Sequence, residues 1–364
     1  MDKNRKKDVG LLTWHYYSNV GSALQAYALF NAVKREGYTC EFINYRKYTD
    51  KGTCYKLVRN ICRIVSDIFP NILPEEYRFR IYAFQKKYFE ESKIIKNPEE
   101  LKELNQNYKC FICGSDQIWA PNVLDTTYLF DFVNADKYKC SYAASIGMNA
   151  IPESMKDVYR KNLDRFNQVS VREKQGEILL KSFINKSVNT VLDPTFLLSK
   201  ESWEKLISKH NKEKLVFCYF LGDAEKYIDA IKAYAKKNDL NIIRFEPNSA
   251  KRKGIKKYMG PEEFLGYIKD SELVVTDSFH GVALSINLEK NFYAVKRFDD
   301  MDVECQNSRV TNILEICDLN ERLLDKFVLS NDDINYVKVR QRLDVEKQRS
   351  MEFLRGCLEE GTME

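Results

Sequence analysis

The sequence predicts an α/β protein made of two doubly wound domains. Its 364 residues exceed what a single hydrophobic core usually organises. Short apolar runs alternate with longer helical patterns, which is typical of parallel strands covered by helices. The alternation pauses at "VLDPTFLLSKESW" and then starts again. We therefore expect one domain over residues 1–195, a second over residues 196–330 and a C-terminal helical segment over residues 331–364.

The elements of the first domain follow from apolar patterning. "VGLLTW" predicts the first strand, and "GSALQAYALFNAVKRE" predicts a helix that stops at Gly37, a residue type common at helix ends. Further strands are predicted at "CEFINY", "KCFIC", "KCSYAAS" and "QVSVR". This order favours a mostly parallel sheet.

A helical insertion is predicted near residues 55–91. Two helical stretches are split by "FPNILP", in which Pro70 ends the first and Pro74 suits the first turn of the second. The first stretch carries an apolar stripe with cations beside it. The stripe is Leu57, Ile61, Ile64, Val65 and Ile68, and the cations are Lys56, Arg59 and Arg63. Either the stripe packs on its own domain or it forms a face that contacts a membrane or a partner.

The second domain repeats the alternation. Strands are predicted at "KLVFCYF", "NIIRF", "LVVT" and "NFYAV", with helices at "AEKYIDAIKAYAKK", "PEEFLGYIKD" and "GVALSINL". The basic stretch "KRKGIKKYMG" predicts a solvated loop, with a rim that attracts phosphate as the alternative. Charged helical patterning continues from about Asp332 onward.

The composition limits the classes of ligand and location. The chain has 44% hydrophobic and 30% charged residues, and its net charge of +5 suits an anionic small molecule or surface without requiring nucleic acid. No apolar run approaches the roughly 20 residues that cross a bilayer, and the basic start lacks the pattern of a signal peptide. We expect a cytoplasmic protein, either free or at the inner face of the membrane.

The cysteine pattern argues against a metal site. Ten cysteines are scattered along the chain, so we expect reduced thiols. Cys110 and Cys113 are the one close pair, and residues three apart on a strand point to opposite faces. Since no second pair completes a zinc site, no metal is expected.

Four polar clusters follow predicted strands, where doubly wound sheets bind their ligands. They are His15, Asn19, Gly21 and Ser22 after the first strand; Gly114, Ser115, Asp116 and Gln117 after "FIC"; Arg172 after "VSV"; and Asp277, Ser278, His280 and Gly281 after "LVVT". Because they come from both domains, a cleft between the domains is the expected place for them to converge.

Each cluster has both a functional and a structural interpretation. A helix start binds anions through free N–H groups and the helix dipole, but Asn19 or Ser22 could simply cap the helix. Neither a dinucleotide fingerprint nor a P-loop is present. The second cluster fits substrate hydroxyls or a simple turn, and Arg172 fits a carboxylate, a phosphate or a surface ion pair with Glu173 or another acid.

Six motifs occur here in an order similar to that of one family. "SNVGSALQAYAL", "FICGSDQIW", "SYAAS", "VSVRE", "LDPTFLL" and "TDSFHG" resemble the polysaccharide pyruvyl transferase family, and the likeness runs from Val9 to Arg309. The resemblance implies two Rossmann-like domains that face a cleft, similar to B-type glycosyltransferases. It also implies phosphoenolpyruvate as donor, with no separate cofactor, and a sugar within a polysaccharide precursor as acceptor. Whether that precursor is a lipid-linked oligosaccharide is left open by the sequence.

The reaction implied is formation of a pyruvate ketal on two sugar hydroxyls, or of an enolpyruvyl group in related enzymes. His280 is the expected general acid or base, with Arg172 and Asp116 completing the catalytic set. Some family members carry arginine where this chain has Ser278, so Arg172 and then Arg309 are the candidates to hold the donor phosphate. The alternatives are a glycosyltransferase that uses a nucleotide sugar and a sugar-binding protein without catalysis.

Overall fold

The computed structural model describes most of the chain. The described ranges are 6–17, 19–46, 76–208, 210–211, 213–249, 254–256, 259–298, 306–324, 328–330 and 332–363. The apolar stripe predicted from Leu57 to Ile68, with Lys56, Arg59 and Arg63, lies outside these ranges. Part of the predicted basic loop over 251–260 lies outside them too.

The first sheet is parallel, with the strand order β2-β1-β3-β4. A separate parallel pair, β5-β6, joins its edge through bridges from Cys140 to Gln168 and from Ala144 to Val171. The strands are β1 Lys7–Leu12, β2 Cys40–Phe42, β3 Tyr108–Cys113, β4 Tyr138–Ser141, β5 Val169–Val171 and β6 Val188–Thr190. Cys110 and Cys113 both lie on β3 and are buried.

The second sheet is also parallel, with the order β11-β10-β9-β7-β8. Its strands are β7 Leu215–Tyr219, β8 Asn241–Phe245, β9 Leu273–Thr276, β10 Phe292–Val295 and β11 Leu323–Leu324. Two parallel sheets with helices between their strands confirm the predicted α/β class. The boundary predicted at residue 195 lies in the short helix that connects the two sheets.

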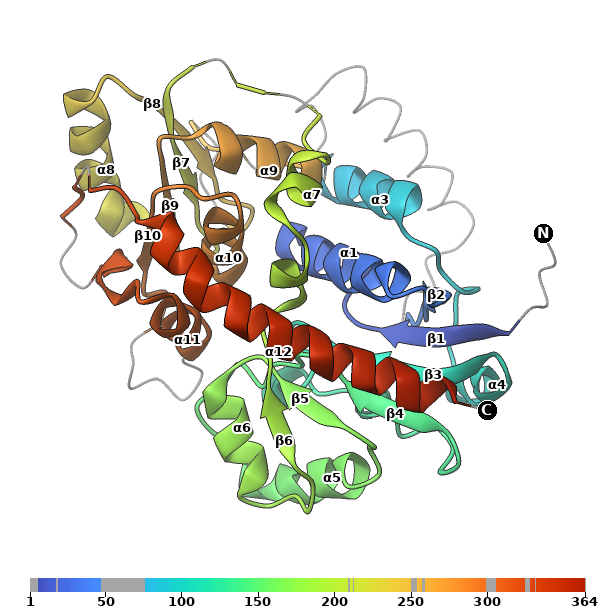
Figure 1. Cartoon of the computed structure of the whole chain (residues 1–364). Coiled ribbons are helices and arrows are strands. Elements are labelled where there is room, and N and C mark those ends of the chain that lie inside the picture. The colour runs from blue at the N-terminus through green and yellow to red at the C-terminus, as the bar shows by residue number, and fades with distance from the viewer. Residues whose placement is uncertain are drawn as a thin grey trace.

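Helices cover the sheets and connect their strands (Figure 1). The α-helices are α1 Val20–Arg35, α3 Glu76–Tyr88, α4 Pro98–Glu103, α5 Glu153–Leu163, α6 Lys174–Lys181, α7 Lys200–Glu204, α8 Glu225–Lys237, α9 Pro261–Asp270, α10 Phe279–Asn287, α11 Ser308–Cys317 and α12 Tyr336–Thr362. The 3-10 helices are η1 Leu104–Gln106, η2 Pro121–Val123, η3 Thr126–Leu129, η4 Pro194–Leu197 and η5 Asn320–Arg322. Among the described residues, no helix has both the length and the hydrophobicity to span a bilayer.

The two halves of the molecule share apolar packing. Helix α1 from the first half packs against α9 from the second and against the connecting η4. One continuous cluster of buried side chains includes Val20 and Leu24 on α1 together with Phe264 and Leu265 on α9. The loops that carry the predicted site are thus held on rigid elements.

The C-terminal helix α12 crosses from the second half to the first (Figure 1). It packs against α11 and against β3 and β4. Leu354 and Leu358 are buried in the core beside β3. Gly361 allows close contact, since a Cβ there would lie 2.8 Å from both Cys110 and Tyr138.

Candidate active site

A cavity of about 140 Å³ collects side chains from both halves of the molecule. Seven of its lining residues were predicted from the sequence: Asn19, Ser22, Asp116, Gln117, Ser278, His280 and Arg309. Five were not predicted: Trp14, Tyr17, Leu221, Phe279 and Arg297. The lining combines an imidazole, a carboxylate, two guanidiniums and three aromatic rings.

His280 lies in the first turn of α10, where the sequence predicted it. Ser278 is the N-cap, and its hydroxyl accepts a hydrogen bond from the Gly281 amide at 3.5 Å. The His280 Nε2 atom is buried without a hydrogen-bond partner among the described residues and lies 3.9 Å from Asp193 Oδ2. Burial lowers the pKa of His280, although Asp193 and Asp116 oppose that effect. The imidazole is therefore neutral at neutral pH in the free protein.

Gly21 lets His280 lie directly on helix α1. A Cβ at Gly21 would come within 2.3 Å of His280 Nδ1, so any side chain there would displace the ring. The structure shows close packing at this glycine, and its part in an anion site stays a prediction. Asn19 is the cap of α1, because its Oδ1 accepts hydrogen bonds from the Gly21 and Ser22 amides.

Asp116 faces the cavity from the loop after β3. Its Oδ2 accepts a hydrogen bond from the Ser22 hydroxyl at 2.5 Å, and its Oδ1 accepts one from the Gln117 amide. Its φ of 68° lies in the left-handed region, which Asp tolerates better than most residues. The turn and the polar lining were alternatives in the sequence, and Asp116 serves both.

Arg172 is buried behind the cavity and does not line it. Its Nη1 pairs with Asp193 Oδ2 at 2.7 Å, and its guanidinium lies 4.3 Å from the centre of the Phe279 ring. Burial would lower its pKa, but Asp193, Glu173 and Asp116 raise it above the usual value. Ser115 donates a hydrogen bond to the same Asp193 oxygen at 3.0 Å. The fork of Arg172 thus holds a carboxylate of this chain, in a buried pair rather than the surface pair considered from the sequence.

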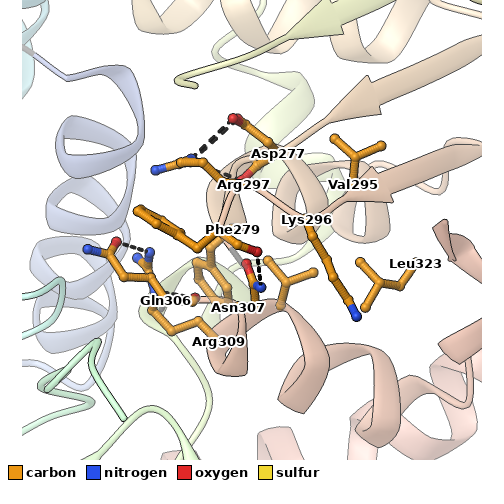
Figure 2. Close-up of a pocket in the computed structure, with 11 residues that line it drawn as sticks. Asp277, Phe279, Val295, Lys296, Arg297, Gln306, Asn307, Arg309 and Leu323 are labelled. Carbon is orange, nitrogen blue, oxygen red and sulfur yellow. Dashed lines mark hydrogen bonds and ion pairs between the residues drawn. The ribbon is translucent and has the colours of Figure 1, made fainter. Parts of the chain in front are cut away.

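Arg309 and Arg297 are the two guanidiniums of the cavity. Figure 2 shows both in the adjoining pocket, which they line together with Asp277 and Gln306. Arg309 Nη2 donates to the Gln306 side-chain oxygen at 2.7 Å, and no described acidic residue pairs with it. Burial, together with Arg172 and Arg297, lowers the pKa of Arg309 to about 9. Because no described carboxylate pairs with Arg309 directly, its charge is opposed only at longer range, by Glu173 and Asp116.

The sequence did not point to Arg297, because the strand before it, β10, is not followed by a recognisable motif. Its Nε lies 3.1 Å from Asp277 Oδ2, and its Nη2 donates to the Asp277 carbonyl at 2.9 Å. Asp277 itself accepts hydrogen bonds from the Leu221 and Gly222 amides. Asp277 thus holds Arg297 at the cavity and itself lines the adjoining pocket. The role of Asp277 in binding stays a prediction.

The remaining predicted residues do not line the cavity. His15 is buried beside Phe42 with ring centroids 4.6 Å apart, and its Nε2 lies 3.4 Å from Glu91. Gly114 has a φ of 126° and presses against the Tyr142 carbonyl, where a Cβ would clash. Gly281 packs against the Thr276 side chain in the same way. These residues support the loops, and Ser115 supports Asp193.

The chain matches the model of one protein family. The model of the polysaccharide pyruvyl transferase family matches residues 19–299, which is most of the chain. The chain belongs to this family. The match includes His280, Asp116 and Arg297, whereas Arg309 lies beyond it. No curated protein matches the chain.

Solved structures resemble this family member in fold. A proposed UDP-N-acetylglucosamine 2-epimerase from Listeria monocytogenes has 10% identity and a TM-score of 0.51, covering 95% of this chain and 97% of that one. A UDP-GlcNAc 2-epimerase from Methanocaldococcus jannaschii has 11% identity and a TM-score of 0.46, covering 93% and 92%. An E. coli heptosyltransferase with ADP has 11% identity and a TM-score of 0.39, covering 93% and 99%.

These likenesses concern the fold alone. The chain has two Rossmann-like halves built on parallel sheets, which confirms the predicted α/β class, and its fold resembles that of the Listeria protein at a TM-score of 0.51. Membership of the polysaccharide pyruvyl transferase family makes the protein a transferase with a sugar acceptor.

Proposed function

We propose that the protein transfers the pyruvyl group of phosphoenolpyruvate to two hydroxyls of a sugar in a polysaccharide or glycan precursor. The observation that carries this proposal is Arg309, a buried guanidinium without an acidic partner among the described residues, in the same cavity as His280. Phosphoenolpyruvate has a phosphate and a carboxylate, and either group balances that charge.

The donor would bind between the two guanidiniums and the start of α10. In this proposal Arg309 takes the phosphate and so serves in place of the arginine that some family members have where this chain has Ser278. Arg297 is oriented by Asp277 and faces the same space. The free N–H groups at the start of α10 add further donors for an anion.

The chemistry then needs one group to move a proton. An acceptor hydroxyl adds to C2 of the donor while C3 takes up a proton and becomes the methyl group. The oxygen of the second hydroxyl then displaces phosphate from C2, its proton leaves with the phosphate, and the ketal closes with release of inorganic phosphate. His280 is neutral in the free protein, and a bound anion raises its pKa, so it can accept the hydroxyl proton and return it to C3. Asp116 accepts a hydrogen bond from an acceptor hydroxyl.

The test measures both products of the proposed reaction, inorganic phosphate and the modified sugar. The protein is incubated with phosphoenolpyruvate and candidate acceptors, including lipid-linked oligosaccharides. Release of inorganic phosphate together with a mass gain of one ketal on the sugar supports the proposal. If isothermal titration shows that a nucleotide sugar binds and that phosphoenolpyruvate does not, a glycosyltransferase is favoured instead. Sugar binding without turnover of either donor would indicate a binding protein.

A further inference from the structure

Two aromatic side chains at the cavity have no part in the donor chemistry. Trp14 and Tyr17 follow β1 and line the same cavity as His280. Their ring centroids are 4.9 Å apart at an angle of 39°. Tyr17 is 42% exposed, which is unusual for a large ring placed at a polar cavity.

The ring pair is held in place from behind. Tyr16 packs on Tyr17 with centroids 4.9 Å apart, and the Arg46 guanidinium lies 5.7 Å from the Tyr16 ring. Trp14 rests on the buried core of the first domain. Because the rings are supported before any ligand arrives, little conformational entropy remains to be lost on binding.

The two halves of the molecule contribute different chemistry to the cavity lining. The second half contributes the guanidiniums of Arg297 and Arg309 beside the neutral His280, which suit the anionic donor. The first half contributes Trp14 and Tyr17, whose ring faces carry partial negative charge and repel an anion. The volume of about 140 Å³ is well below the roughly 300–1,000 Å³ of pockets that enclose a larger ligand. A donor inside the cavity therefore leaves the acceptor at its mouth, beside Tyr17.

We propose that Trp14 and Tyr17 form the acceptor subsite, on which one pyranose ring stacks. A pyranose presents C–H groups on its faces and hydroxyls around its edge. The C–H groups suit the negative faces of aromatic rings, and the hydroxyls can reach the polar groups of Asn19, Asp116 and Gln117, which line the same cavity. This inference rests on the proposed function, because it is the proposed transfer that requires the sugar to lie next to His280.

Tryptophan fluorescence can test the subsite without turnover. The chain has three tryptophans, and Trp119 and Trp203 are fully buried. Acrylamide should therefore quench Trp14 selectively, and Trp14→Phe should remove the quenchable component. The probes are the methyl pyranosides of glucose, galactose, mannose and N-acetylglucosamine. We expect at least one of them to protect Trp14 from acrylamide in a saturable manner.

Variants of Tyr17 supply the control. Tyr17→Ala should raise the dissociation constant of the protecting pyranoside roughly tenfold, as expected when a stacking ring is lost. Tyr17→Phe keeps the ring and should recover most of the affinity. Tyr234→Ala removes a partly exposed tyrosine from α8, outside the cavity, and should leave the dissociation constant at its original value.

The outcomes separate this inference from the proposed function. No protection of Trp14 by any pyranoside, or equal affinity in Tyr17→Ala and the original protein, overturns the subsite even if phosphoenolpyruvate is consumed. Protection that depends on the Tyr17 ring supports the subsite even if no phosphate is released, in which case only the pyruvyl transfer fails.

Discussion

The surroundings of His280 affect its pKa in opposite directions. Burial favours the neutral imidazole, whereas the carboxylates of Asp193 and Asp116 favour the imidazolium. The result is a lowered pKa in the free protein, which an anionic donor would raise again. Gly21 fixes the ring position, because no other residue would leave room for it.

We expect His280→Gln to lower turnover with phosphoenolpyruvate by at least about a hundredfold, since proton transfer typically contributes 10²–10⁴ in rate. Glutamine fills a similar volume but cannot take up a proton. Initial rates of phosphate release measure the effect, and thermal unfolding checks that the variant is folded. A folded variant with the original turnover would exclude His280 from proton transfer.

The same histidine predicts how stability depends on pH. Its pKa in the folded protein lies below the ordinary value of 6.5, so the unfolded chain binds the proton first as the pH falls. Stability should therefore be complete above about pH 6.5 and should decline below it. Arg172 and His280 lower the pKa of buried Asp193 below 3.8, so the stability it contributes is lost only at more acidic pH.

Urea unfolding at about pH 7 and about pH 5 can isolate this contribution. We expect the free energy of unfolding to fall less between these values in His280→Gln than in the original protein. An equal decline in both proteins would assign the pH dependence to other groups.

Arg309 should show opposite effects on binding and stability. Its buried charge has no acidic partner among the described residues, so Arg309→Gln should maintain or increase the free energy of unfolding. The same change should weaken phosphoenolpyruvate binding at least about tenfold, as measured by isothermal titration. Arg342→Gln is the control, because Arg342 pairs with Asp318 at the surface. Loss of stability without loss of donor binding would make Arg309 structural.

Gly361 lets the last turn of helix α12 approach β3 and β4 closely. Gly361 faces Cys110 and Tyr138 closely, whereas a Cβ at Gly356 on the same helix would meet nothing within 4 Å. We expect Gly356→Ala to stabilise the protein by roughly 0.5–1 kcal/mol, since alanine favours a helix. Gly361→Ala should destabilise it, because the methyl group would push α12 away from β3. Urea unfolding of both variants measures the difference, and equal effects would mean that α12 does not dock as described.

Sequence patterning was most informative about regular elements. The first helix was predicted over 21–36 and observed as α1 Val20–Arg35, and the charged C-terminal pattern became α12. These elements follow from local periodicity, which the sequence carries directly. Their partners do not, because the packing of α12 on β3 joins residues more than 200 positions apart.

The site was only partly predictable for the same reason. Asp116, Ser278 and His280 follow strands and carry recognisable chemistry. Arg172 was predicted to bind the donor. In the structure its guanidinium pairs with Asp193, which lies 21 residues further along the chain. Arg297 and Tyr17 carried no motif, and their importance depends on which loops meet. A signal for Tyr17 existed in the run of aromatic residues after the first strand.

At the scale of the molecule, the two halves are joined more firmly than two domains around an open cleft. The shared cluster of buried side chains continues from α1 into α9. Lys87 and Tyr88 on α3 contact Glu262 on α9, at 2.9 Å and 3.0 Å. A large apolar interface disfavours free motion of one domain against the other. The cavity is therefore a fixed feature, and both halves should unfold together.

Tryptophan fluorescence can test this cooperativity in a Trp203→Phe background, because the two remaining tryptophans, Trp14 and Trp119, both lie in the first half. Ile231 is fully buried on α8, in a cluster confined to the second half of the chain. Ile231→Ala should cost about 2–5 kcal/mol through the cavity that it leaves. If the shared core couples the halves, the fluorescence midpoint in urea should fall together with the calorimetric midpoint. A variant whose fluorescence midpoint stays unchanged while a separate calorimetric transition moves to lower temperature would show that the halves unfold independently. In that case α1 and α9 would form an interface that opens, and the volume available to the donor and sugar would differ from that of the cavity described above.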